Sequence, residues 1–188
     1  MKTVKKFLML LLLSLYSITS YAYDFEVDGI YYNFSGSNAE VTYSNKYNGS
    51  YQGSIIIPNT VTYNGETYCV TSIGKSAFEE SRSLTSITIP NSVKSIGSGA
   101  FESCYGLTAV NITDLEAWCN IDFESYNSNP LYFAQHLYLR GEEIKELVIP
   151  NSITTIGDYA FQGCSSLTSV TIPNSVTSIG VRAFLTCI

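Results

Sequence analysis

The 188-residue sequence is poor in the residues that most enzyme and metal sites require. It has a single histidine, His136, and charged residues make up only 14 % of the chain. A lone histidine with no serine or cysteine nucleophile placed near it is a weak candidate for a catalytic base. The five cysteines lack CxxC or Cys/His spacing, and calcium loops and glycine-rich phosphate loops are absent from the sequence. We therefore expect no enzyme, no catalytic residue, no metal site and no cofactor.

Long apolar runs are lacking after residue 22. The first 22 residues have a basic start, an apolar run from Phe7 to Leu13 and small residues at Ser20 and Ala22, in the order of a secretory signal peptide. The run is short for a membrane span, which needs about 20 apolar residues. We predict a signal peptide at 1–22, no membrane span after its cleavage, and a secreted or cell-surface protein.

Positive charge is also scarce. Without residues 1–22 the chain would carry seven Lys and Arg against 16 Asp and Glu, a net charge of −9. Phosphate backbones repel so acidic a chain, and the sequence has no basic stripe. Nucleic acid and anionic membrane surfaces are therefore not expected partners.

An internal repeat dominates the sequence. The segments 84–97 and 167–180 share the pattern Leu-Thr-Ser-x-Thr-Ile-Pro-Asn-Ser-Val-x-Ser-Ile-Gly, and the Ile-Gly pair recurs 23 residues apart. Such a fixed period indicates a solenoid, in which each coil buries its apolar edge against the next coil. The alternation around Ile87 and Ile89 predicts a strand with these two side chains pointing inward, ended by Pro90.

The second half of each coil is expected to be helical. Ala100, Phe101, Cys104 and Leu107 recur at helical spacing, which suggests one or two helical turns that pack Phe101 into the core. Gly97 is expected to form the corner before them in a left-handed conformation.

Three cysteines, Cys104, Cys164 and Cys187, share one inward position of the repeat. There a thiol behaves as a small apolar side chain, so buried free thiols are our preferred interpretation. A disulfide between Cys164 and Cys187, in adjacent coils, remains the alternative.

The coil resembles a known repeat. The pattern Leu-x-x-Ile-x-Ile at 84–89, then Ile-Pro-Asn-Ser-Val-x-Ser-Ile-Gly, Ala-Phe and Cys, is similar to the BspA-type leucine-rich repeats of secreted and surface proteins of host-associated microbes. The resemblance covers roughly 55–188. The predicted fold class is an α/β solenoid, a short right-handed leucine-rich-repeat coil of about 23 residues per repeat behind a β-rich N-terminal cap. The resemblance also implies adhesion, because some relatives bind host matrix proteins or other cells.

The sequence divides into three parts: the signal peptide at 1–22, a β-rich cap at 23–57 and repeats at 58–188. Hairpins are expected at Asp28-Gly29 and Asn64-Gly65, between strand-like runs. A degenerate coil with an insertion is expected at about 113–143, because the step from Gly97 to Gly157 exceeds two coils by 14 residues. Within it we predict a helical turn at 115–119 and a strand at 136–139. The array is expected to be truncated at its C-terminus.

The exposed strand positions are the candidate ligand-binding residues: Ser86, Thr88, Asn111, Glu146, Val148, Ser169 and Thr171. We predict an extracellular or cell-surface binding or adhesion module that recognises a host or cell-surface protein or glycan. The alternative is a structural spacer or assembly unit that self-associates through an uncapped C-terminal end, or a truncated array without function. Whether the insertion binds or is a tolerated surface loop, and whether its tyrosines recognise a partner or pack a strand, stays open.

Overall fold

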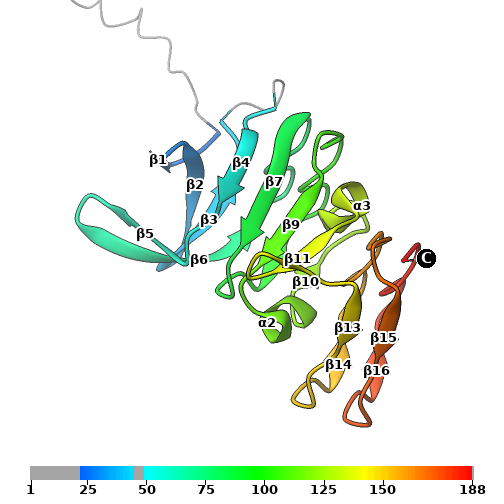
Figure 1. Ribbon diagram of the computed structural model, residues 1–188. Coiled ribbons are helices and arrows are strands. Elements are labelled where there is room, and N and C mark those ends of the chain that lie inside the picture. Colours follow the sequence, from blue (N-terminus) through cyan, green and yellow to red (C-terminus); the bar gives the residue numbers. More distant parts are fainter. Residues whose placement is uncertain (1–21, 45–48, 188) are drawn as a thin grey trace, which may run out of the picture.

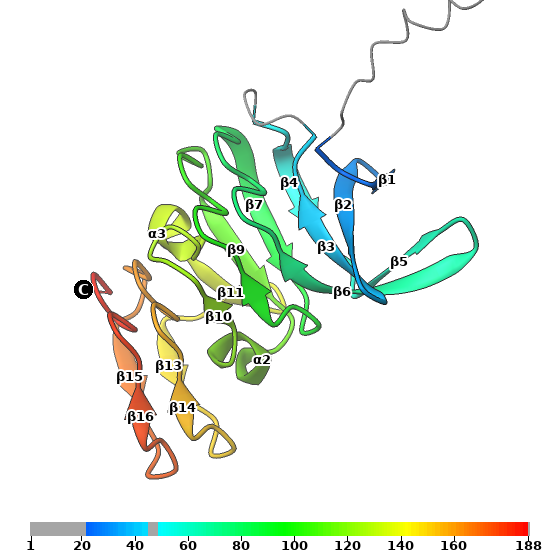
Figure 2. The ribbon, with the colours of Figure 1, turned by 180° about the vertical axis from the view of Figure 1, so that it is seen from behind.

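The computed structural model describes residues 22–44 and 49–187, so the predicted signal peptide lies almost entirely outside the described residues. Short strands dominate, and most of them stack side by side from the β1 end to the β16 end, while the hairpin of β5 with β6 projects to one side (Figures 1 and 2). The predicted solenoid is confirmed. Its α/β description is not, because only two short helices, α2 and α3, accompany the strands in the described part of the chain.

Two large sheets and two small ones form the solenoid. The seven-stranded sheet consists of β1 (Phe25–Val27), β2 (Ile30–Ser35), β3 (Asn38–Thr42), β5 (Thr60–Tyr63), β6 (Glu66–Ile73), β8 (Ser95–Ile96) and β10 (Asp122–Phe123). The five-stranded sheet consists of β4 (Gln52–Ile56), β7 (Ser83–Ile89), β9 (Ala109–Ile112), β11 (Leu137–Leu139) and β12 (Glu142–Glu143). The two-stranded sheets pair β13 (Glu146–Val148) with β15 (Ser169–Thr171), and β14 (Thr155–Ile156) with β16 (Ser178–Ile179).

Successive coils pair in parallel at the period of the repeat. In β7 and β9, Ile87 lies opposite Val110, and both side chains are fully buried. On the other side of the coil, Ile73 of β6 lies opposite Ile96 of β8. The predicted inward positions are therefore confirmed, and the core runs along the solenoid axis between the sheets.

The expected helical turns of the repeat are wrong. The chain instead makes successive turns in which an amide donates three residues back, as from Ala100 to the Gly97 carbonyl (3.1 Å) and from Cys104 to Phe101 (3.1 Å). Each turn segment contains two left-handed residues at fixed repeat positions; Gly99 and Ser103 hold them in one coil, with φ of +68° and +62°. Left-handed residues break a right-handed helix. The turns nevertheless direct Ala100, Phe101 and Cys104 into the core, as the predicted helix would have done.

The expected left-handed corner at Gly97 is also wrong. Gly97 is not among the residues with positive φ. A Cβ on Gly97 would lie 2.5 Å from the Lys75 nitrogen, and one on Gly180 would lie 2.4 Å from the Asp158 nitrogen. Glycine is required there because the backbones of adjacent coils approach too closely for a side chain.

Aromatic rings and thiols stack through the core of the turns. The Phe78 and Phe101 rings are parallel, with centroids 4.8 Å apart. Cys104 Sγ lies 3.0 Å from the Phe78 carbonyl oxygen, which it contacts as a thiol donor one coil away. All five cysteines are free thiols, and only Cys69 is not fully buried. This agrees with the preferred interpretation from the sequence.

Both predicted hairpins are confirmed. β1 and β2 pair antiparallel around Asp28 and Gly29, and β5 and β6 around Asn64 and Gly65, all four in left-handed conformations. Within the predicted cap, β3 and β4 already pair in parallel with β6 and β7. Coil stacking thus starts inside this segment, while the domain limits at 22 and 57 stay predictions.

The insertion separates the last two coils from the first ones. Its helical turn is confirmed as α2 (Leu115–Cys119), capped by the Asp114 carboxylate, which accepts from the Ala117 amide at 2.8 Å. The Gly157 amide donates to the Cys119 carbonyl (3.2 Å) at the position where Gly97 donates to Ile73 of the preceding coil. α2 therefore occupies the place between β10 and β14 where a regular coil would stack.

Candidate functional site

Three of the seven predicted ligand-binding residues share the outer face of the five-stranded sheet. Thr88 lies opposite Asn111, and Ser86 lies opposite Ala109. All three predicted residues are half-buried. Ser86 donates its hydroxyl to Ser54 Oγ on β4 at 2.7 Å. The outward residues of neighbouring strands thus form a polar row that continues onto β4, because alternate residues of paired strands lie on the same face of a sheet.

The other four predicted residues lie on a separate sheet. Glu146 lies opposite Ser169 and Val148 opposite Thr171, in the two-stranded pair of β13 and β15, and all four are exposed. No strand pairing joins this pair to the five-stranded sheet in the described part of the chain. The predicted residues thus form two faces and not one, and whether they bind a ligand stays a prediction.

β12 is the element that divides the face. It pairs antiparallel with β11, with Tyr138 opposite Glu143, and ends the five-stranded sheet. The chain turns at Arg140 and Gly141, both in left-handed conformations, and folds back as β12, a strand that the sequence pattern does not indicate. Tyr138, in register with Asn111, extends the polar row and could have been found by continuing the alternation along the predicted strand.

A small charged group lies at this boundary. His136 Nδ1 lies 2.6 Å from Glu143 Oε1, and Lys145 Nζ lies 3.6 Å from Glu143 Oε2. The hydrogen bond with His136 holds the pKa of the Glu143 carboxyl below its usual range. An exposed pair of this kind contributes little to stability. It does place charged side chains beside Tyr138 on the surface.

Three exposed tyrosines and the half-buried Phe133 gather along one edge of the turns. This aromatic edge consists of Tyr105, Tyr126, Tyr132 and Phe133, from a regular coil, from the insertion loop and from α3 (Leu131–Ala134). Their rings meet edge to face at centroid distances of 5.1–5.8 Å. Tyr105 is 70 % exposed, and the Arg82 guanidinium lies 5.9 Å from its ring centroid.

The insertion that carries much of this edge is firmly anchored. Trp118 is buried, and its indole N–H donates to the Ala160 carbonyl at 2.9 Å. Asn129 is also buried and donates to the carbonyls of Tyr159 (2.7 Å) and Ala160 (3.1 Å). Anchoring by satisfied buried polar groups fixes the loop in one conformation. Tyr126 and Tyr132 are therefore displayed from a fixed support.

The described residues offer neither a metal cluster nor a membrane-spanning helix. Among residues 22–44 and 49–187, no cluster of three or more His, Cys, Asp or Glu side chains has a geometry that could hold a metal ion. The same part of the chain has no helix with the length and apolar character needed to cross a membrane.

With this geometry established, the comparison with family models is decisive. Six copies of the BspA-type leucine-rich repeat region match residues 40–137 and 132–188. The chain belongs to the BspA-type leucine-rich repeat family. No curated protein matches it significantly.

Solved structures of bacterial leucine-rich repeat proteins are similar to this member of the family. A leucine-rich cell surface protein from Faecalibacterium prausnitzii is 25 % identical, with 87 % of this chain and 52 % of that chain covered and a TM-score of 0.49. A leucine-rich repeat protein from Bacteroides ovatus is 29 % identical, with 88 % and 45 % covered and a TM-score of 0.45. The chain spans about half the length of these two proteins.

Proposed function

We propose that the protein is a secreted or cell-surface binding module of the BspA-type family that recognises a protein or glycan partner, with adhesion as its role. The observation that carries the proposal is the aromatic edge. Tyrosines supply a large contact area and a hydroxyl at low cost in conformational entropy, which is why recognition surfaces favour them. Here they are held rigidly, because Trp118 and Asn129 anchor the insertion beneath them.

The polar strand face is the second part of this binding surface. Thr88, Asn111 and Tyr138 offer hydroxyl and amide groups in a row on paired strands. Such a row can bind an extended protein segment or a glycan through several weak hydrogen bonds. The seven residues predicted from the sequence enter the proposal as this row and its counterpart on β13 and β15.

The test is a binding screen against immobilised matrix proteins and a glycan array, with two surface variants compared with the unmodified full chain. Tyr105→Ala with Tyr132→Ala removes the exposed rings of the aromatic edge. Thr88→Lys with Asn111→Lys blocks the strand face, and neither pair removes a fully buried side chain.

We expect a ligand to be bound by the unmodified chain and lost in at least one variant, while circular dichroism shows both variants folded. Binding that survives in both variants would place recognition elsewhere. A panel in which the unmodified chain binds nothing above background would contradict the proposal.

A second candidate is an assembly unit, and it is favoured by one surface. In β15, β16 and the residues that follow each strand, apolar side chains are exposed: Val170, Ile172, Ile179, Val181 and Leu185. Exposed apolar side chains gathered within one coil are typical of an interaction surface. Light scattering over a concentration series should then show association of the full chain, and Ile179→Thr with Val181→Thr should reduce it.

A further inference from the structure

The two large sheets end unevenly at the cap. β3 and β4 stack on β6 and β7, so they belong to the same layer of the solenoid. Beyond β3 the seven-stranded sheet continues with β2 and β1, whereas β4 is the edge of the five-stranded sheet in the described part of the chain. A strand position beside β4, opposite β2, is therefore open.

The open edge of β4 presents backbone hydrogen-bonding groups. The Ile57 amide donates to the Thr88 carbonyl at 3.1 Å, and Ile55 lies opposite Ile87. In a parallel sheet, every second residue of a strand forms its backbone hydrogen bonds with the neighbour on one side, and the residues between them point to the other side. Ser54 and Ile56 therefore direct their amide and carbonyl groups away from β7. No backbone partner for these groups on that side is found among residues 22–44 and 49–187.

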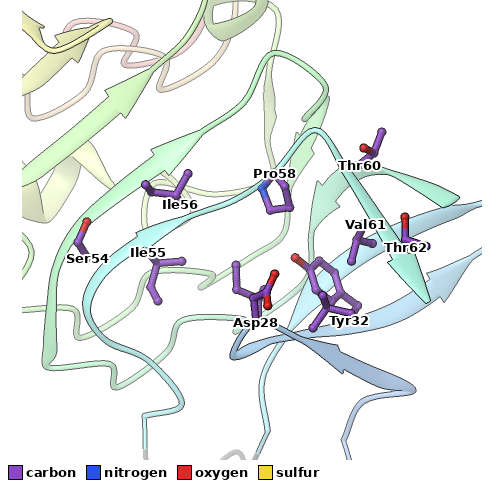
Figure 3. A pocket seen from close by; sticks show the side chains of 11 residues that line it. Asp28, Tyr32, Ser54, Ile55, Ile56, Pro58, Thr60, Val61 and Thr62 are labelled. Atoms are coloured by element: carbon purple, nitrogen blue, oxygen red, sulfur yellow. The ribbon is translucent and has the colours of Figure 1, made fainter. Parts of the chain in front are cut away.

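A pocket of about 400 Å³ lies at this edge, between β4, the β1–β2 turn and β5 (Figure 3). Its walls are mainly apolar, formed by side chains that include Ile30, Ile55, Ile56, Pro58 and Val61. Ile56 is 68 % exposed, the largest exposure among the apolar side chains of the cap. The volume suits one or two apolar side chains of a bound segment.

One polar group in the pocket lacks a partner. The Tyr32 side chain is fully buried, yet its hydroxyl makes no hydrogen bond within the described structure. Figure 3 shows this hydroxyl directed toward the space between Asp28 and Pro58. A buried hydroxyl without a partner costs free energy, and a ligand carbonyl or hydroxyl in the pocket would supply the missing hydrogen bond.

The charge around the pocket selects among extended segments. Asp28 lines the pocket, and Asp24, Glu26 and Glu40 lie elsewhere in the cap. The described residues before Lys75 contain no Lys or Arg. A segment with basic residues beside its apolar ones is therefore attracted to this end of the molecule, and an acidic segment is repelled.

From these observations we propose that the edge of β4 is a peptide-binding groove, in which an extended segment of a partner protein, apolar at its centre and basic at its flanks, adds as a strand. Its backbone pairs with Ser54 and Ile56. One of its apolar side chains fills the pocket, and one of its carbonyl or hydroxyl groups accepts from Tyr32. Addition of a strand to a sheet edge is a general mode of peptide recognition. The groove is distinct from the aromatic edge and the strand face of the proposed function.

The test uses the full chain and a defined probe, a fluorescent nine-residue peptide of alternating threonine and valine with a lysine at each end. Binding is measured by fluorescence polarisation. Two control peptides carry N-methyl groups on the amides of one edge or of the other, which removes hydrogen-bond donors from that edge only. We expect the unmodified peptide to bind and only one of the two methylated peptides to lose binding.

Protein variants test the groove itself. Ile56→Pro removes an amide that does not bond to β7, and proline is tolerated on the open side of an edge strand; it should weaken the peptide at least tenfold. Ile56→Thr keeps the amide and is the matched control. Tyr32→Phe should leave stability unchanged or higher, because the lost hydroxyl has no partner, while it weakens the peptide by about 2- to 10-fold.

Three results would overturn the proposal. The first is absence of peptide binding up to millimolar concentration. The second is equal binding of the two methylated peptides and of the unmodified peptide. This comparison uses the unmodified protein, so it remains valid even if Ile56→Pro fails to fold. The third is a dimer in sedimentation equilibrium that Ile56→Pro dissociates, which would assign the edge to a second copy of this chain. The Tyr105→Ala variant should bind the peptide normally, which separates this groove from the proposed function.

Discussion

Replacement of one repeat glycine should test how closely the coils stack. A Cβ at Gly97 would lie 2.5 Å from the Lys75 nitrogen and 2.9 Å from the Gly74 carbonyl carbon, both backbone atoms of the preceding coil. Neither atom can move aside alone, so Gly97→Ala must push two coils apart and stretch the 2.8 Å bond from the Gly97 amide to Ile73. Gly157 occupies the same repeat position, but its Cβ would meet only the Ile121 carbonyl at 3.2 Å and that of Cys119 at 3.4 Å.

The magnitudes follow from these contacts. Overpacking of a close contact costs about 1–3 kcal/mol, and replacing glycine by alanine returns about 0.4–1 kcal/mol through the lower entropy of the unfolded chain. Gly97→Ala should therefore lower the free energy of unfolding by about 1–2 kcal/mol, while Gly157→Ala should change it by less than about 0.5 kcal/mol.

Urea unfolding followed by circular dichroism measures both values. With a slope of about 2 kcal/mol per molar urea, Gly97→Ala should shift the midpoint down by about 0.5–1 M with little change in slope. Equal midpoints for the two variants would refute the reasoning, because they would show that the glycine is not required by the approach of one coil to the next.

Three further predictions concern single side chains. Ser103→Gly should raise the free energy of unfolding by up to about 1 kcal/mol in the same urea experiment, because Ser103 has a φ of +62°; a loss of stability would contradict the turn geometry. Burial raises the pKa of the Cys104 thiol to about 12, so a maleimide at pH 8 should label half-buried Cys69 first and Cys104 only after urea is added; mass spectrometry identifies the labelled site. Glu143 should titrate below the usual carboxyl range in an NMR experiment, so its negative charge persists above that lowered pKa and is lost as the pH falls through it. His136→Gln should raise the midpoint of this titration; an unchanged midpoint would show that the hydrogen bond does not act on the carboxyl.

The parts of the fold that sequence could predict are those set by local patterns. The alternation around Ile87 places a strand face correctly, because a strand has only two faces. Asn64-Gly65 predicts a hairpin correctly, because both residues accept left-handed conformations at low cost. The sequence pattern of the turns between strands resembles that of a helix, because turns and helices both bring residues three or four apart in the chain to the same side of the segment. Ser103, in contrast, gives no sequence signal that it is left-handed.

The candidate site was predictable residue by residue but not as a surface. The outward positions of Thr88 and Val148 follow from alternation within each strand. Whether they share one face depends on the strands between them, and β12, which lies there, consists only of Glu142 and Glu143. The antiparallel β12 is stabilised by pairing with β11, a contact that no local pattern specifies.

The insertion accounts for both the break in the solenoid and the surface it displays. On one side of the coil α2 stands between β10 and β14 (Figure 1). On the other side β12 ends the five-stranded sheet after β11, and β13 pairs only with β15, so both ladders are interrupted by the insertion. A tolerated surface loop needs no buried contacts, yet Trp118 and Asn129 converge on the Ala160 carbonyl of the next coil. Loss of either side chain would remove a hydrogen bond to the Ala160 carbonyl of that coil. It would also release the loop that carries Tyr126 and Tyr132. These buried contacts therefore argue against a merely tolerated surface loop, and removal of the insertion should destabilise the last coils, while binding through the insertion stays a prediction.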